Sequence, residues 1–300
     1  NIYLKTIPPA EAVARVKASI DREKLIREET IPAHEASGRV LAHAVHARYS
    51  APTFHSAAMD GYAVNARATF TAREGHPLTL RAGESCFAVN TGHPMPEGCD
   101  AVIMIEQVVQ NGDAITIEAP AFPWQHVRRI GEDIVATELL FPRNHHLRPW
   151  DVGALLSGGI WDVPVWERVS VRIIPTGDEV LDFTAHPDPG KGQVVESNSQ
   201  MLAALARELG CTVERVTPVR DDPEALHQAL RDSLDAGTHL TIFCAGSSAG
   251  SKDFTRATLE KEGEILTHGI AAMPGKPSLL ANCRGRLVAG APGYPVSALV

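Results

Sequence analysis

The feature that most constrains the fold is the alternation of short apolar runs with helical segments from residue 169 to residue 300. The runs VRIIP (171–175), TVERV (212–216) and TIFC (241–244) have helix signals between them. Strands that alternate with helices form parallel β-α-β units, so we expect an α/β domain with a mostly parallel sheet. In such sheets ligands bind beyond the carboxyl ends of the strands.

The helices between these strands are marked by their ends. Gly210 follows a helical segment over 198–209, as expected for a helix that ends in a left-handed residue. Asp222 can accept hydrogen bonds at the start of the next helix, which has Pro223 at its first position. A third helix is expected over 253–261.

The first half of the chain has a different pattern. Helices are expected over 8–27 and 35–41, and a short helix within 147–159 that ends at glycine. Between them, short apolar runs alternate with turn residues, and Asn111-Gly112 predicts a hairpin.

We therefore expect three domains. Residues 1–49 and 123–168 form a discontinuous N-terminal domain, residues 50–122 form a β-rich domain inserted into it, and residues 169–300 form the α/β domain.

The overall composition excludes several functions. The net charge is −8 and no run of Lys and Arg occurs, so the chain lacks the basic footprint of a nucleic-acid-binding protein. No apolar run is long enough to span a membrane, and the first residues do not look like a signal peptide. The five cysteines are odd in number and widely spaced, which favours free thiols in a reducing compartment. We expect a cytoplasmic protein.

Three polar motifs occur in the first half. Asp60 lies in FHSAAMDGYAV, Thr91 in NTGHPMPEGCDAVIM and Asp133 in VRRIGEDI. Each motif alone is typical of a turn, because acidic residues beside glycine are common in turns.

More polar motifs follow the strands of the α/β half. Asp178 and Glu179 lie in TGDE, directly after an apolar run, where carboxylates could hold a hard cation. The loop 245–250 (AGSSAG) could wrap an anion with its amides, although it matches neither dinucleotide nor P-loop patterns. Ser197 and Asn198 precede a helix and could simply cap it. Lys276 lies between prolines in PGKP and could be an ordinary surface lysine.

Taken together, these segments resemble the molybdopterin molybdenumtransferases, including the eukaryotic gephyrin-type fusions. Eight motifs match in order over essentially the whole chain, with one extra alanine in the first. They are SAAMDGYAV (56–64), the segment 91–102, GEDI (131–134), TGDE (176–179), SN with the following ML (197–202), 245–253, PGKP (274–277) and the segment 292–298.

The resemblance implies an activity. Members of the family transfer molybdenum from molybdate to the dithiolene of adenylylated molybdopterin and release AMP, with a divalent cation such as Mg²⁺. The resemblance implies a homodimer whose site is completed by the β-rich domain of the partner subunit, and a molybdopterin adenylyltransferase or molybdoenzymes as further partners. It also implies a three-layer, MogA-like α/β domain that binds the pterin, and a small β domain after residue 298 that has no counterpart in these 300 residues.

The resemblance also implies roles for individual residues. Metal or electrostatic roles fall on Asp60, Asp133, Glu179 and Asp253, and Thr91 is expected to contact substrate; the metal ligands among them are Asp60, Glu179 and Asp253. The pterin-phosphate pocket is expected to contain Thr176, Gly177, Asp178, Glu196, Ser197, Asn198, Gly246, Ser247, Ser248, Gly250, Lys276, Pro292, Gly293 and Ser297.

Several pocket positions depart from the family pattern. Glu196 replaces an aspartate and Tyr294 replaces an asparagine, and Ala245, Ser251 and Met273 also differ. These changes keep a second hypothesis open, namely a non-catalytic molybdopterin-binding module that acts as a carrier, sensor or scaffold. An unrelated nucleotide-binding α/β protein is a third hypothesis, which the ordered motifs disfavour. We favour the enzyme, because the five residues expected to be catalytic are all present.

Overall fold

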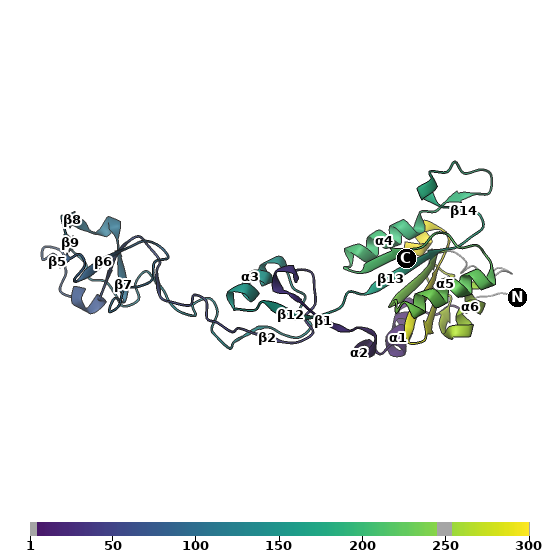
Figure 1. Ribbon diagram of the computed structural model, residues 1–300, viewed down its shortest axis with the longest axis horizontal. Coiled ribbons are helices and arrows are strands. Elements are labelled where there is room, and N and C mark those ends of the chain that lie inside the picture. Colours follow the sequence, from purple (N-terminus) through teal and green to yellow (C-terminus); the bar gives the residue numbers. More distant parts are fainter. Residues whose placement is uncertain (1–4, 245–253, 300) are drawn as a thin grey trace. The chain divides into compact units, whose positions relative to one another are not determined.

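The computed structural model describes residues 5–244 and 254–299, and the chain groups into two compact units (Figure 1). Unit 1 consists of residues 1–29 and 166–300, and unit 2 consists of residues 30–165. The chain therefore passes between the units twice. In the described parts of both units, no helix is long and apolar enough to cross a membrane.

Unit 1 is built on a six-stranded sheet. In spatial order its strands are β16 (Thr212–Arg215), β13 (Ser170–Pro175), β17 (Leu240–Cys244), β20 (Arg286–Ala291), β19 (Leu279–Cys283) and β18 (Gly263–His268). The first four strands are parallel, which confirms the expected β-α-β units. β19 pairs antiparallel with both β20 and β18. The carboxyl ends of the parallel strands thus lie along one edge of the sheet.

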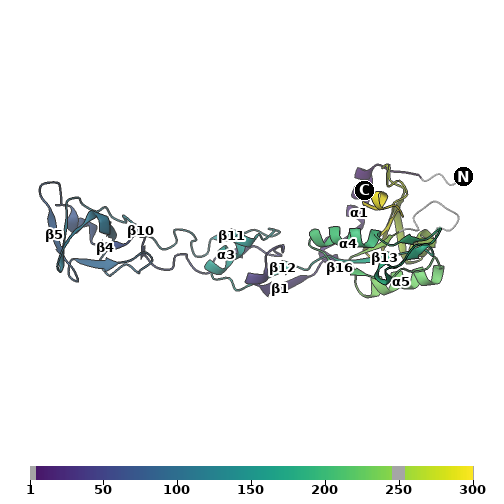
Figure 2. The same ribbon diagram turned by 90° about the horizontal axis from the view of Figure 1, so that it is seen from above.

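Helices cover both faces of this sheet, so unit 1 has three layers (Figure 2). One face carries α1 (Pro9–Ser19), α4 (Asn198–Glu208) and α7 (Pro295–Leu299), and the other carries α5 (Pro223–Asp235) and α6 (Phe254–Glu262). Successive side chains of a strand point to opposite faces. Ile173 therefore packs in the cluster that contains Leu202 of α4, whereas Ile174 packs with Leu226 of α5.

A short excursion leaves the sheet after β13 and returns just before α4. It contains β14 (Val180–Leu181), the 3-10 helix η4 (Phe183–Ala185) and β15 (Val194–Val195). The strands β14 and β15 pair with each other in parallel. We call residues 180–195 the excursion.

The N-terminal segment differs from expectation. In place of one helix over 8–27 the structure has α1 and a short α2 (Arg22–Leu25), because the backbone at Ile20 is extended. The Arg15 guanidinium donates to the Leu266 carbonyl at 2.8 Å, so α1 packs on the strands of unit 1. Residues 1–29 accordingly group with 166–300. The expected division into three domains stays a prediction.

Unit 2 is made of short strands and turns. The chain from residue 28 to residue 166 forms β1 (Glu28–Pro32), η1 (Ala33–Glu35), β2 (Val45–His46), β3 (Ser56–Ala57), β4 (Gly61–Val64), η2 (Ala66–Thr69), β5 (Leu78–Arg81), β6 (Cys86–Val89), β7 (Ala101–Met104), η3 (Ile105–Gln107), β8 (Val109–Asn111), β9 (Ala114–Ile117), β10 (Val127–Arg128), β11 (Leu139–Phe141), α3 (Pro149–Ser157) and β12 (Asp162–Trp166). Its core residues form separate clusters, one within 31–165 outside the β-rich segment and others within 57–127.

Local predictions for unit 2 had mixed outcomes. The hairpin at Asn111-Gly112 is confirmed by the pairing of β8 with β9, and the helix that ends at glycine is confirmed by α3. The helix expected over 35–41 is wrong. Gly38 has a φ of +77°, which ends any helix there, and Leu41 instead forms a bridge with Val165.

Candidate functional site

A cavity of about 480 Å³ lies at the carboxyl ends of β13 and β17, beside the N-terminus of α4. Its walls come from strand ends, from both strands of the excursion and from the segment after β20. The lining residues are Pro175, Thr176, Glu179, Val180, Val194, Val195, Glu196, Ser197, Asn198, Cys244, Gly293, Tyr294 and Pro295. The cavity is large enough for a small organic ligand.

The turn after β13 is fixed by Thr176 and Gly177. The backbone N–H and the hydroxyl of Thr176 both donate to the Cys244 carbonyl, at 3.0 and 3.1 Å. Gly177 has a φ of +134°, and a Cβ there would lie 2.7 Å from a methyl of Val180. Only glycine suits this position, and the tight turn brings the exposed Glu179 to the cavity.

The N-terminus of α4 is held by Glu196. Its carboxylate is 3% exposed and accepts hydrogen bonds from the backbone N–H and the hydroxyl of Ser199, at 2.7 and 2.5 Å. Ser197 stands at the N-cap position but makes no capping hydrogen bond through its side chain. The Asn198 amide donates to the Gly293 carbonyl at 2.8 Å and thereby joins the motif before α4 to the motif after β20.

Arg215, at the end of β16, binds the same carboxylate. Its guanidinium donates to the Ser199 hydroxyl at 2.9 Å and lies 3.4 Å from Glu196 and 3.2 Å from Asp182. The positive charge of Arg215 offsets the cost of burying the two acids and their mutual repulsion. Sequence analysis missed Arg215, because it lies in no motif and is one polar residue in an ordinary strand. Its burial in the structure is the observation that indicates a role.

Cys244 forms the floor of the cavity. Burial raises the pKa of its thiol to about 12, and the negative charge of Glu196 adds to the increase while Arg215 opposes it. The group is therefore a neutral thiol at physiological pH and a poor nucleophile.

Other predicted residues of this half lie at or beyond the rim. Tyr294 is 80% exposed, and Lys276 is exposed in the turn after the cis peptide bond Met273–Pro274. The carboxylate of Asp178, the residue after Gly177, accepts a hydrogen bond from the Asp221 N–H at 3.4 Å. Gly177, Asp178, Lys276, Pro292 and Ser297 were predicted for the pocket but are not part of the cavity lining. Ala245, Gly246, Ser247, Ser248, Gly250, Ser251 and Asp253 lie outside the described residues.

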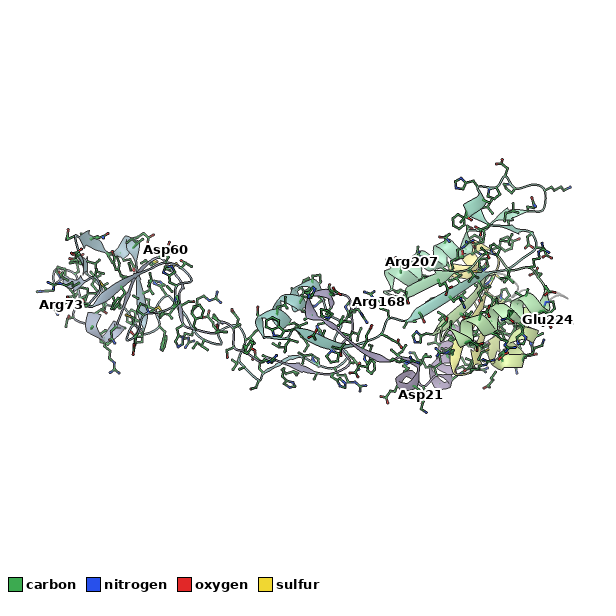
Figure 3. All side chains as sticks on the ribbon, in the orientation of Figure 1. Asp21, Asp60, Arg73, Arg168, Arg207 and Glu224 are labelled. Atoms are coloured by element: carbon green, nitrogen blue, oxygen red, sulfur yellow. The ribbon has the colours of Figure 1, made fainter. Side chains whose placement is uncertain are left out.

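In unit 2 the structure joins two of the predicted residues directly. The Asp60 carboxylate, labelled in Figure 3, accepts hydrogen bonds from the Thr91 backbone N–H at 2.7 Å and from its hydroxyl at 3.0 Å. These two bonds hold the pKa of Asp60 below its ordinary value, and nearby His93 lowers it further. The pair is exposed, so it presents an ionised carboxylate and a hydroxyl to solvent.

Two further residues of this region, Gly61 and Asp133, have roles that the structure makes clear. A Cβ at Gly61 would lie 2.0 Å from the Ile103 carbonyl oxygen, so glycine is required where Asp60 leads into β4. Asp133 is bound by the Arg128 guanidinium, with distances of 3.0 and 2.8 Å to its two oxygens. Its carboxylate is thus already in an ion pair.

Comparisons with known proteins cover the whole of this architecture. Residues 7–159 match the family described as the MoeA N-terminal region (domain I and II), and residues 172–300 match the one described as a probable molybdopterin binding domain. The molybdopterin molybdenumtransferases of Synechococcus elongatus and Haemophilus influenzae are 32% and 33% identical, each over 91% of this chain and over 72% and 69% of their own lengths.

A solved structure agrees with these matches. The crystal structure of the molybdopterin biosynthesis MoeA protein from Pyrococcus horikoshii is 30% identical, with a TM-score of 0.83 over 98% of this chain and 76% of the other. The similarity therefore extends over both units.

Proposed function

The chain belongs to the molybdopterin molybdenumtransferase family, and on this premise we propose that it is the enzyme of molybdenum cofactor biosynthesis that inserts molybdenum. The substrates are molybdate and adenylylated molybdopterin. Molybdenum is transferred to the dithiolene of the pterin, and the bond between the two phosphates is hydrolysed with release of AMP.

The observation that carries this proposal is the cavity at the strand ends. It gathers residues from three separate motifs of the sequence, namely Thr176 and Glu179, Asn198, and Gly293, with their neighbours. The amide hydrogen bond from Asn198 to Gly293 fixes two of these motifs against each other. The cavity volume of about 480 Å³ suits a pterin-sized ligand.

The donor set of this cavity fits Mg²⁺. Among the described residues no cluster of three metal-binding side chains occurs. Mg²⁺ in phosphate chemistry usually takes one or two carboxylates and completes its shell with water and phosphate oxygens, so the exposed Glu179 at the cavity is a sufficient protein ligand, with Asp253 as the second that the motifs favour. When bound, the ion neutralises charge on the phosphates.

The protein's own groups bind and align the ligand. Cleavage between two phosphates depends on alignment and charge neutralisation more than on covalent catalysis. The N-terminus of the eleven-residue helix α4 lies at the cavity, where the Glu196 carboxylate balances its positive end and Arg215 adds a cation behind it. Val180, Val194 and Val195 line the cavity with apolar side chains that a planar ring can cover.

We further propose that the active form is a homodimer. The ionised carboxylate of Asp60 and the hydroxyl of Thr91 belong to unit 2, and in this proposal unit 2 of the partner subunit brings them to the pterin cavity. The pair would orient the molybdate or the attacking water through hydrogen bonds.

AMP release tests the proposal. The full chain is incubated with adenylylated molybdopterin, molybdate and Mg²⁺, and AMP is quantified. We expect AMP with the unaltered chain, and at least a hundredfold less with Glu179→Ala or Asp60→Ala, as is typical for loss of a group that acts in the transition state. Matched controls are Asp188→Ala in the excursion and Asp113→Ala in unit 2, two exposed acids outside the site.

The outcomes separate the two functions. Tight binding of molybdopterin without AMP release would contradict the enzyme and support a binding module, for which the exposed Tyr294 at the rim is the relevant substitution. Failure of the unaltered chain to bind molybdopterin would contradict both.

A further inference from the structure

The excursion forms much of the cavity wall although it stands apart from the sheet. Val180, Val194 and Val195 all line the cavity. The two strands that carry them are two residues long and pair with each other. Such short strands have little stability of their own, so the position of this wall depends on what holds its ends.

Both ends of the excursion are held by one side chain. The Arg215 guanidinium lies 3.2 Å from Asp182, just after β14, and 3.4 Å from Glu196, just after β15. It also stacks on the ring of Phe183 in η4, with 4.7 Å from its central carbon to the ring centroid. Arg215 itself is anchored on β16, at the edge of the sheet.

Burial makes these contacts strong. The side chain of Arg215 is 13% exposed, and those of Glu196 and Asp182 are 3% and 21% exposed. Ion pairs that are shielded from water are screened little by salt, and charge-assisted hydrogen bonds are about twice as strong as neutral ones. The planar guanidinium of Arg215 reaches Ser199, Glu196 and Asp182 together from several nitrogens in a fixed geometry, whereas an ammonium group would have to reach all three from one nitrogen.

We propose that Arg215 is a positioning residue that holds the excursion against the sheet and thereby sets the affinity of the cavity for the pterin. This inference rests on the proposed function for the identity of the ligand. Arg215 does not line the cavity, so its effect reaches the ligand through Asp182, Glu196 and the valine wall. We call Arg215 with its two acidic partners, Asp182 and Glu196, the clamp. The Glu196 carboxylate, to which the family resemblance gave a role in ligand binding, is therefore part of the clamp.

The test compares variants that differ only in the clamp. Asp182→Asn removes the negative charge that faces Arg215, keeps a side-chain oxygen that can accept from Thr184, and leaves the buried contacts between Arg215, Glu196 and Ser199 in place. Asp188→Asn makes the same change at an exposed position of the same excursion and is the matched control. Arg215→Gln and Arg215→Lys remove and retain the positive charge.

Two measurements are made on the full chain. Amide hydrogen exchange reports the excursion without any ligand, and we expect residues 183–194 to exchange at least tenfold faster in Asp182→Asn than in Asp188→Asn, with α5 unchanged. The dissociation constant of molybdopterin is expected to rise roughly five- to tenfold in Asp182→Asn, as for the loss of one charge-assisted hydrogen bond. The KM for the adenylylated pterin should rise by a similar factor with kcat within twofold, and Arg215→Lys should recover part of the affinity that Arg215→Gln loses.

The results distinguish this inference from the proposed function. Equal exchange and equal pterin affinity in the two aspartate variants would overturn the inference even if the unaltered chain releases AMP. A drop in kcat without a change in KM would also overturn it. Faster exchange in Asp182→Asn, with no pterin binding by the unaltered chain, would support the clamp and refute the proposed ligand.

Discussion

Replacing Glu196 by alanine gives a sharp test of how the N-terminus of α4 is built. The carboxylate accepts two hydrogen bonds from Ser199 and lies beside the guanidinium of Arg215. Alanine would leave the Ser199 N–H without its acceptor and would leave Arg215 with Asp182 as its remaining acidic partner. Each of these losses has a known scale.

The expected loss of stability follows from these contacts. Losing a helix-capping acceptor costs about 1 kcal/mol. Breaking a buried ion pair costs about 3–5 kcal/mol when the cation loses every partner, and roughly half of that applies here because Asp182 remains. The Ser199 hydroxyl keeps its contact with Arg215. We therefore expect Glu196→Ala to lower the free energy of unfolding by about 3 kcal/mol, and Glu196→Gln, which keeps an acceptor for Ser199, by about 1 kcal/mol.

Urea denaturation of the full chain, with native-state amide exchange in α4 to assign the change to unit 1, measures these values. Glu208→Ala is the matched control, because Glu208 is an exposed acid at the other end of α4 and should change stability by less than about 0.5 kcal/mol. If Glu196→Ala lost less than about 1 kcal/mol, the carboxylate would not be holding the helix, and the positioning of the cavity wall would need another cause.

Three further predictions concern unit 2. Because its folded pKa is lowered from 3.8 by Thr91, Asp60 contributes stability above pH 3.8 that is lost as the pH falls through the folded value; a carboxyl carbon NMR titration should show this low pKa, and Thr91→Val should raise it part of the way back. Gly61→Ala should destabilise unit 2 by about 1–3 kcal/mol in denaturant, since its Cβ would lie 2.0 Å from the Ile103 oxygen. Gly153→Ala should instead raise stability by about 0.5–1 kcal/mol, because this exposed helical position has open space for a methyl group; a fall would contradict the helical geometry of α3.

The parallel sheet could be predicted because its signals are local. Strand runs, caps and helix ends each lie within a few residues, and α4 and α5 begin where Asn198 and Asp222 indicated. The packing of α1 could not be predicted, since its partners on β18 and β19 lie about 250 residues away in the chain, as the bond from Arg15 to Leu266 shows. Amphipathic spacing indicates that one face of a helix is packed against other residues, but it does not identify those residues.

The sequence predicted which residues belong to the candidate site better than it predicted what each residue does there. The motifs located Thr176, Glu179 and Asn198, which the structure gathers around one cavity. The task of Glu196 was not visible, because an acidic residue before a helix is equally suited to a ligand and to a cap. Arg215 was missed because its importance comes from burial between two acids distant in sequence, which no local pattern records.

The contact of α1 with the last strands of the sheet also bears on how the chain is synthesised. Ser19 accepts a hydrogen bond from Asn282, so the first helix and its final partner are separated by 263 residues. At about 5–20 residues per second, the ribosome needs roughly 13–50 s to produce that partner. During this interval α1 has no surface to pack on. Its apolar face is sparse, and Ala12 is its one buried residue in the folded protein.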